Sequence, residues 1–557
     1  MKEKQKQPRR LFGGTQKRID EAVDRALMQR IGRLQASGYG DAGASTTRRS
    51  FKGFNSTSGS PKIDIDWHNQ KLRERGRMLV MSTPMAKSAI ATTRTNVIGR
   101  GLQLKSKIDH RALGMTVEQA DEWQRKTEKE FALWANNKRT ADATGVNDFN
   151  GLQQLAFTAQ LASGDAFALM QHTDKVDALH PYGLRVRLIE ADLVRTPGGM
   201  DTDGKAENGN SIHDGVEVDS NGAIVAYYIH STYPASFGEN AADTYKRVEA
   251  YGAKSGLPNV SHMMESERPG QYRGVTFLAP VIEPLLQIRR YTDSELTAAN
   301  IENAFSAFIK TLADTSEMPF NEVGSGDDWV QGGSAYTDQV STDPNEYELG
   351  PGTINVMAPG EDVTFANPTR PASGFAAFVE AIASQVGAAL EIPRELLLKC
   401  FNSSYSASRA ALLEAWKSFQ MRRQWFTDDF CRPIYEVWLT EAIARGRISA
   451  PGFFNDAAIR QAYLGSHWIG PSQGMLDPTK EIAAEVAAIA AGFSTHEAST
   501  IKLNGGQWGD NVAQLEVERR RLIDAGLADD GNAIMNYAAA KIIAAAMNTD
   551  SKEEKTE

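Results

Sequence analysis

The sequence predicts a protein of the α+β class that is mainly helical, and three observations lead to this prediction. The chain has 557 residues, of which 41% are hydrophobic and 24% charged. It is therefore long enough for several domains, because one hydrophobic core rarely serves more than about 250–300 residues. Alternating apolar residues between positions 101 and 230 indicate short strands, and apolar residues at three- and four-residue steps elsewhere indicate long helices.

Residues 64–275 form the predicted α+β domain, which follows a basic and largely disordered arm at residues 1–63. Helical apolar spacing runs from Leu72 to Val97. Strand patterns follow at DAFALMQHT, at LRVRLIEADLV and at GVEVDSNGAIVAYYIH. Asn221-Gly222 within the last pattern favours a hairpin turn.

Two long helices with an irregular insert between them follow this domain. We expect the first helix within residues 276–312 and the second within 373–397, where Pro393 ends it. The insert, residues 313–372, is rich in Gly, Asp, Ser, Thr and Pro, and long irregular inserts are usually functional or disordered. Within it, TINVMAPGEDVTF indicates two short strands around a Pro-Gly turn.

The remaining chain is predicted to be helical apart from one loop. A polar loop at residues 398–409 leads into a long helix at 410–447, which Pro433 should kink. Further helices are expected over residues 448–527, and a charged tail at 528–557.

Composition and charge restrict the class of protein. Cys400 and Cys431 cannot build a disulfide framework, no apolar run reaches the roughly 18–20 residues that cross a bilayer, and no signal core follows the basic N-terminus. We therefore expect a protein of the reducing cytosol, or one assembled there, without membrane contact.

The net charge is unevenly distributed along the chain. The whole sequence carries −9, but residues 1–60 hold 13 Lys and Arg against 5 Asp and Glu, which gives +8 and leaves −17 on the remainder. A basic arm binds nucleic acid or an acidic partner, or is simply a solvated leader. The acidic body disfavours tight, sequence-independent DNA binding, but it suits a surface past which DNA slides.

No motif for catalysis is found. Gly204-Lys205 lacks the spaced glycine and the Ser or Thr of a phosphate-binding loop, and neither G-x-S-x-G nor H-E-x-x-H occurs. Glu190 and Asp192 are better explained as surface carboxylates at a strand end than as an acid–base pair. We expect no catalytic residue, no metal site and no cofactor.

Four segments, in this order, resemble the lambda family of bacteriophage portal proteins: LRERGRMLVMSTPMAKSAIATTRTNVIGRGLQL, ERPGQYRGVTFLAPVI, NSSYSASRAALLEAW and HWIGPSQGMLDPTKE. The resemblance covers residues 64–526. It implies a portal-type fold with a wing (64–275), a stem (276–312 and 373–397), a clip (313–372), a tunnel loop (398–409) and a C-terminal helical crown (448–527).

The resemblance also implies the partners of the protein. It implies a homo-oligomeric ring of twelve subunits at one capsid vertex, with double-stranded viral DNA passing through the channel during packaging and ejection. The terminase large subunit, the major capsid protein and a head–tail connector are the other implied partners. The implied location is the virion, with the host cytoplasm during assembly.

The tunnel loop holds the predicted DNA-channel residues. A channel for any DNA sequence needs weak phosphate contacts without base readout, and short polar donors with only two charges suit this task. Alternatively, Ser404 or Ser406 caps the following helix and the loop is ordinary surface. The predicted residues are Lys399, Asn402, Ser403, Ser404, Tyr405, Ser406 and Arg409.

The turn RPGQYRG raises a second hypothesis. Arg268, Gly270, Arg273 and Gly274 are predicted to set the angle at which the first stem helix leaves the wing, where neighbouring subunits meet. An ordinary turn that precedes a helix is the alternative.

Two other classes of function stay open from the sequence. One is a subunit of a nucleic-acid-processing enzyme anchored by the basic arm, which clustered acidic metal ligands would support. The other is a head–tail adaptor of the same particle, which the chain length and the stem–clip–stem order disfavour.

Overall fold

The computed structural model describes residues 22–25, 44, 49–54, 56–198, 203–234, 243–303, 307–309, 354–356, 374–401, 404–474 and 478–524. For residues 300–303, 307–309, 354–356, 405 and 406 it describes the backbone alone. The chain divides into two units, residues 1–60 and 61–557. In the first, a short 3-10 helix spans Arg49–Phe51. Everything below concerns the second unit.

Two consecutive helices open this unit, as the apolar spacing predicts. A π-helical turn (η3, Lys62–Asp66) leads into α2 (Trp67–Ser82), and α3 (Pro84–Val97) follows after one extended residue. The break falls at Thr83-Pro84, because proline disfavours a helical conformation in the residue before it but is well placed in the first turn of the next helix.

Two further major helices, α4 (Val117–Ala135) and α6 (Phe149–Ser163), were not identified from the sequence. Each begins at a capping residue: Thr116 forms a capping box with Gln119, and Asp148 accepts from the Gly151 amide. The short α5 (Lys138–Ala141) lies between them.

The four strands predicted between positions 165 and 230 belong to two antiparallel sheets, which four further strands complete. The first has the order β3-β2-β9 and the second is a meander, β4-β5-β6-β7-β8. The predicted hairpin is confirmed, since β6 and β7 pair across Asn221-Gly222 and Gly222 has a φ of 84°. The strands span Asp165–His172 (β2), Leu184–Glu190 (β3), Asp203–Lys205 (β4), Ser211–His213 (β5), Val216–Val218 (β6), Ile224–His230 (β7), Tyr245–Glu249 (β8) and Val260–Met264 (β9), with a 3-10 turn (η4) at Ala191–Leu193 after β3.

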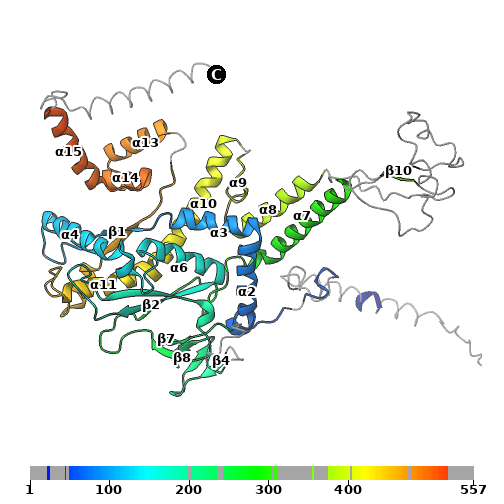
Figure 1. The fold of residues 1–557 in the computed structure, drawn as a ribbon, viewed down its shortest axis with the longest axis horizontal. Coiled ribbons are helices and arrows are strands. Elements are labelled where there is room, and N and C mark those ends of the chain that lie inside the picture. Colours follow the sequence, from blue (N-terminus) through cyan, green and yellow to red (C-terminus); the bar gives the residue numbers. More distant parts are fainter. Residues whose placement is uncertain are drawn as a thin grey trace, which may run out of the picture. The chain divides into compact units, whose positions relative to one another are not determined.

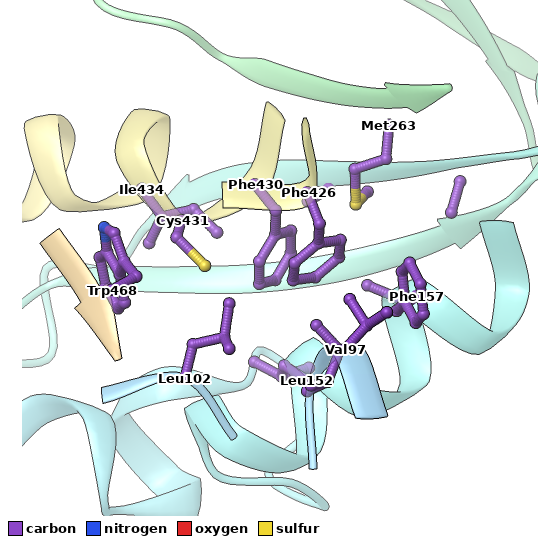
Figure 2. Packing of buried hydrophobic residues seen from close by; sticks show 14 of the residues in the cluster. Val97, Leu102, Leu152, Phe157, Met263, Phe426, Phe430, Cys431, Ile434 and Trp468 are labelled. Carbon is purple, nitrogen blue, oxygen red and sulfur yellow. The ribbon is translucent and has the colours of Figure 1, made fainter. Parts of the chain in front are cut away.

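Residues beyond position 426 complete the core of these elements. Strand β1 (Gln103–Ser106) pairs antiparallel with β12 (Ser466–Ile469), more than 350 positions later. Tyr435 and Trp438 of helix α11 (Arg432–Ala444) contact the ring of Phe131 on α4. Figure 2 shows Phe426, Phe430 and Trp468 meeting Leu102 and Leu152 in this core.

The two long helices expected on either side of the insert lie side by side, as Figure 1 shows, and Tyr291 of α7 contacts the rings of Phe375 and Phe378 of α8. Helix α7 (Ile282–Asn303) follows a 3-10 turn at Ala279–Val281, and α8 spans Phe375–Ala389. The helix predicted to extend to position 312 therefore ends earlier, and Ala307–Ile309 (β10) pairs parallel with Ile354–Val356 (β11) instead. One predicted insert strand is thus present in part; the other, and the remainder of the insert, lie outside the described residues.

Near Pro433, where a kink was predicted, the structure shows a change of helix type. Helix α10 (Tyr405–Phe426) continues through a π-helical segment, η7 (Thr427–Cys431), into α11, whose first turn contains Pro433. Proline has no amide hydrogen, so the carbonyl of Asp429 has no helical donor four residues later. The Ser261 hydroxyl donates to that carbonyl and satisfies it.

The remaining elements lie between and after the strands of the β1–β12 pair. A short helix α9 spans Arg394–Leu398, between α8 and α10, and α12 spans Ala457–Tyr463. Three helices follow β12: α13 (Pro478–Ala490), α14 (His496–Asn504) and α15 (Trp508–Asp524). The predicted charged tail at 528–557 lies outside the described residues.

We predict that Phe131→Ala destabilises the protein by about 3–5 kcal/mol, because it leaves a cavity in a closed aromatic core. Phe131 is 4% exposed and contacts the rings of Trp134, Phe149, Tyr435, Trp438 and Trp468. Leu133 on the same helix is 58% exposed, so Leu133→Ala is the control and should change little. Urea unfolding followed by tryptophan fluorescence measures both. Equal shifts in the two variants would contradict the core assignment.

Candidate functional site

The candidate channel site is built around α9, which lies between two residues with left-handed backbone. Glu391 (φ 56°) precedes the helix and Lys399 (φ 57°) ends it. In the described chain the only other non-glycine residue with positive φ is Asp214. This conformation costs a non-glycine residue roughly 1–2 kcal/mol and tends to occur at functional sites. Glycine would adopt this backbone conformation at position 399 with less strain than lysine. The geometry of the turn therefore does not explain why the residue there is a lysine.

Side-chain hydrogen bonds hold α9 at both ends. At its start, Glu391 accepts from the Ser418 hydroxyl (2.6 Å) and from Arg422 (3.3 Å), both on α10. At its end, the Ser88 hydroxyl of α3 donates to the Leu397 carbonyl (2.7 Å). The Lys399 ammonium donates to Thr92 Oγ1 of α3 (2.7 Å). The loop after α9 is therefore anchored on two helices of the main body.

The structure places the predicted loop residues in three situations. Lys399 and Ser404 are exposed, and so are Cys400 and Phe401 between them. Asn402 and Ser403 lie outside the described residues. Tyr405, Ser406 and Arg409 belong to the first turns of α10, so the predicted loop at 398–409 ends at Ser404. The reason is local, because the run after Ser404 is rich in good helix formers. Ser404 occupies the N-cap position, but its side chain makes no capping hydrogen bond.

The two predicted loop cations differ in their environment. Arg409 lies 3.5 Å from the Glu481 carboxylate of α13, so its charge is largely compensated. Lys399 forms no ion pair with any residue that the structure describes. Its ammonium has three N–H donors, and the bond to Thr92 uses one of them. Lys399 is therefore the cation of this loop best placed to meet an external anion.

The turn 268–274 contains an arginine that is buried rather than exposed. Arg273 is fully buried, and its guanidinium binds Asp165 in a bidentate manner (2.5 and 3.2 Å). It also donates to the carbonyls of Val194 (2.8 Å) and Ala191 (2.9 Å), and it pairs with Asp214 (2.9 Å). The Arg273 side chain therefore links residues of both sheets in the protein interior.

A second arginine extends this buried ion network, which we define as Arg73, Arg273, Asp165, Asp192 and Asp214. Arg73 of α2 pairs with Asp192 (3.0 Å) and Asp214 (3.6 Å). The interpretation of Asp192 as a surface carboxylate is wrong, since its side chain is 13% exposed and binds both Arg73 and Arg77. Glu190 is half exposed and lies 3.3 Å from Arg77, as expected for a surface group.

The network sets the protonation of its members. Burial alone would raise the pKa of Asp165, but the Arg273 guanidinium, a hydrogen bond from His262 and the charge of Arg73 hold that pKa far below its usual value. The burial of Asp192 is likewise outweighed by Arg73 and Arg77, which lower its pKa. The pKa of His262 is lowered by burial. Both carboxylates are therefore ionised at neutral pH.

The other turn residues fix its shape. Arg268 pairs with the exposed Asp64 (2.5 Å), and Gly270 has a φ of 78°. Gly274 lies against Gly164 so closely that a Cβ on Gly274 would stand 2.0 Å from the Gly164 carbonyl oxygen. Any side chain at either glycine would separate the turn from the end of α6.

Two further observations concern the described part of the chain. It contains no group of three or more His, Cys, Asp or Glu side chains arranged to hold a metal ion. None of its helices combines the length and apolarity that crossing a membrane requires.

Comparison with known proteins decides the family. A family model described as phage portal protein, lambda family, matches residues 47–423, which is more than half of the chain. The chain belongs to the lambda family of phage portal proteins. The resemblance noted from the four sequence segments is thereby confirmed. This portal family is structural rather than enzymatic, and its members are components of the virion.

Two curated relatives extend the portal match over most of the chain. The portal protein of Escherichia phage N15 is 24% identical over 495 residues, which cover 86% of this chain and 89% of that protein. Portal protein B of Escherichia phage lambda is 24% identical over 464 residues, covering 81% and 83%. Among solved structures, a chain from the neck of a native gene transfer agent particle, computed with C12 symmetry, is 13% identical with a TM-score of 0.35. It covers 78% of this chain and 93% of that one.

The sequence interpretation selected Arg273 but missed its partners. Asp165 opens β2, Asp192 follows β3 and Asp214 lies between β5 and β6, and no local pattern indicates that the three meet. Arg73 was not selected either, although it lies three and four positions from Gly76 and Asn69, which are buried with it on α2.

We predict that Asp165→Asn destabilises the protein by about 3–5 kcal/mol, because it leaves buried guanidinium groups without their counter-charge. Asp64→Asn removes an exposed ion pair and should cost at most about 1 kcal/mol. Because the pKa of Asp165 is lowered on folding, its contribution is present above about pH 4 and is lost as the pH falls below that value. Urea midpoints measured from pH 3 to 7 should therefore decline more steeply in the wild type than in Asp165→Asn. Parallel pH curves would refute the assigned charge state.

Proposed function

We propose that twelve copies of this portal protein form a ring at one capsid vertex, around a channel that passes double-stranded DNA, and that residues 399–404 face this DNA. Membership of the portal family supports the ring and the vertex. The observation that carries the loop assignment is Lys399, an exposed cation anchored on α3 without an ion pair in the described chain.

The chemistry of the loop suits transient contact with a moving duplex. An ammonium is a compact point charge that attracts any phosphate oxygen and reads no base. Repeated around a ring, Lys399 becomes a collar of positive charge on a protein whose body carries −17 outside residues 1–60. A few weak cations in an acidic channel bring the duplex to the axis without holding it, because strong retention requires many neutralised phosphates.

The other partners belong to the same proposal. A portal ring at a capsid vertex contacts the major capsid protein, the terminase large subunit during packaging and a head–tail connector afterwards. The clip insert, residues 313–372, is the segment that we expect to supply one of the two subunit surfaces of the ring. Assembly takes place in the host cytoplasm, and we assign the protein no catalytic step.

The turn 268–274 supports this function by fixing the wing against the stem. Arg273 and Gly274 are buried against their own chain, so their role is to orient α7 as it leaves the sheets. Arg268 and Gly270 keep exposed surface, so they are the members of the turn that a neighbouring subunit reaches.

We predict that Lys399→Ala reduces the yield of DNA-filled particles several-fold while rings and empty shells still assemble, because an exposed loop residue contributes little to the core. Lys417→Ala on α10 is the control, since it removes an exposed cation that is paired with Glu414. Arg409→Ala should have the smaller effect, given its bond to Glu481. Packaged DNA is measured by nuclease protection. Full packaging by a Lys399→Ala, Arg409→Ala double variant would mean that the loop does not face DNA.

We also predict that DNA shields Cys400. The chain has two cysteines, of which Cys400 is exposed and Cys431 is buried, so the wild-type protein carries a single accessible thiol next to Lys399. Maleimide labelling followed by mass spectrometry should modify Cys400 readily in free rings and empty shells, and much more slowly in DNA-filled particles. A Cys placed at exposed Leu179 in a Cys400→Ser background should label equally in both states. Equal labelling of Cys400 in full and empty particles would place the loop away from the channel.

A further inference from the structure

The stretch from α2 to the end of β1 concentrates positive charge in an acidic protein. Residues 75–108 contain 7 Lys and Arg and no Asp or Glu, whereas the chain outside residues 1–60 carries −17. Arg77 and Lys105 pair with carboxylates of other elements. The other five cations form no ion pair with any residue that the structure describes: Arg75, Lys87, Arg94, Arg100 and Lys107.

Three of these unpaired cations follow α3 from its first turn to the loop beyond its end. We call Lys87, Arg94 and Arg100 the α3 basic surface. Lys87 and Arg100 are exposed and Arg94 is half-buried. Lys87 and Arg94 are separated by seven residues, or about two helical turns, so their side chains leave the same side of α3 about 10 Å apart.

The stability of α3 does not explain Lys87. Its amide donates to the Thr83 carbonyl (3.0 Å) and closes the first turn, which contains no acidic residue. The amides of a first turn carry partial positive charge, so Asp and Glu stabilise a helix there and Lys destabilises it. Arg94, by contrast, lies in the last turn, where the helix dipole favours a cation. An unpaired lysine at the end of the helix that disfavours it indicates a partner outside the chain.

The α3 basic surface adjoins the candidate channel site. Helices α9 and α10 both pack against α3 (Figure 1). The Lys399 ammonium donates to Thr92 of α3 (2.7 Å). At 3.6 residues per turn, Thr92 and Lys87 lie on opposite flanks of the side of α3 that carries Ala91 and Thr95. Cations therefore stand on both flanks of a strip of small side chains, of which Thr95 is exposed.

We propose that the α3 basic surface binds the phosphate backbone of the same DNA that Lys399 meets. This inference rests on the proposed function, and it extends the contact from one loop to a helix of the main body. The contact reads no bases, because phosphate contacts carry no sequence information. The guanidinium groups of Arg94 and Arg100 can each donate two parallel hydrogen bonds to a phosphate, whereas Lys399 offers a point charge. Continuity with Lys399 favours DNA over an acidic surface of another subunit as the partner.

The first test is lysine acetylation of wild-type monomers, empty shells and DNA-filled particles, with modified residues identified by mass spectrometry. Lys87 and Lys399 should both be acetylated several-fold more slowly in filled particles than in empty shells, because DNA covers them. Lys175, which is exposed and forms no ion pair in the described chain, is the internal reference and should react equally in both.

The possible outcomes separate this inference from the proposed function. Shielding of Lys399 by DNA without shielding of Lys87 would overturn the inference and leave the function intact. Shielding of neither lysine would refute the DNA-facing loop itself. Equal shielding of Lys87 in empty and filled shells, relative to the monomer, would assign this side of α3 to a neighbouring subunit and would also overturn the inference.

A matched pair of triple variants tests whether the position of the charge matters. The Lys87→Gln, Arg94→Gln, Arg100→Gln variant should form rings and empty shells but give several-fold fewer DNA-filled particles, measured by nuclease protection. The control is Lys138→Gln, Lys175→Gln, Lys254→Gln, which removes the same charge from exposed positions on other elements and should package as the wild type does. Equal losses in the two variants would mean that net charge alone acts, and wild-type packaging by the α3 variant would refute the contact.

A single substitution keeps the proposal testable if the triple α3 variant does not fold. Lys87→Glu places an acid in the first turn of α3, where the helix dipole favours it, so the melting temperature should not fall. The same change repels phosphate, and the yield of DNA-filled particles should therefore decrease. A Lys87→Glu protein that packages DNA at the wild-type yield would contradict the α3 basic surface.

Discussion

The buried salt bridge between Arg273 and Asp165 is the interaction on which the rest of the described structure depends. It holds the turn before α7 against β2, and the same guanidinium binds carbonyls after β3 and the carboxylate of Asp214. Two charges removed from water are tolerated only when the geometry and the remaining hydrogen bonds are satisfied together. The position of both sheets, α2 and the start of the stem is therefore determined jointly, and no one of these elements moves without breaking the network.

Helix α3 connects this arrangement to the candidate channel site. Its Ser88 hydroxyl donates to the Leu397 carbonyl, and its Thr92 hydroxyl accepts from Lys399. At the end of α3, Arg423 of α10 donates to the carbonyls of Asn96 and Val97. Burial lowers the pKa of Arg423 to about 10, which still leaves it charged at neutral pH. Of the two left-handed residues, Lys399 is held by Thr92 of α3, and Glu391 by Ser418 and Arg422 of α10. The candidate loop is thus supported by two helices of the main body.

The main body and the helices of residues 478–524 differ in what they bury. In the body, the buried charges of Arg73, Arg273 and Asp165 are paired, and the carbonyl of Asp429 that Pro433 leaves without an amide donor accepts from the Ser261 hydroxyl. In residues 478–524, the two buried residues, Glu485 and Ser499, are polar, and apolar side chains of α15 are exposed.

The sequence by itself determined the family, the class of fold and the helices with strong apolar periodicity, since α2, α3 and the β6–β7 hairpin follow from local pattern and turn chemistry. It also selected Lys399 and Arg273 as candidate residues. Only the tertiary structure decided what these residues contact. Arg273 and Asp165 are 108 positions apart, and β1 and β12 more than 350, and no local periodicity encodes such pairings. In the sequence, Arg273 stands in a polar turn and resembles a surface residue. In the fold it is buried at the centre of an ion network, because the partners that make its burial possible come from strands that meet only in the folded chain.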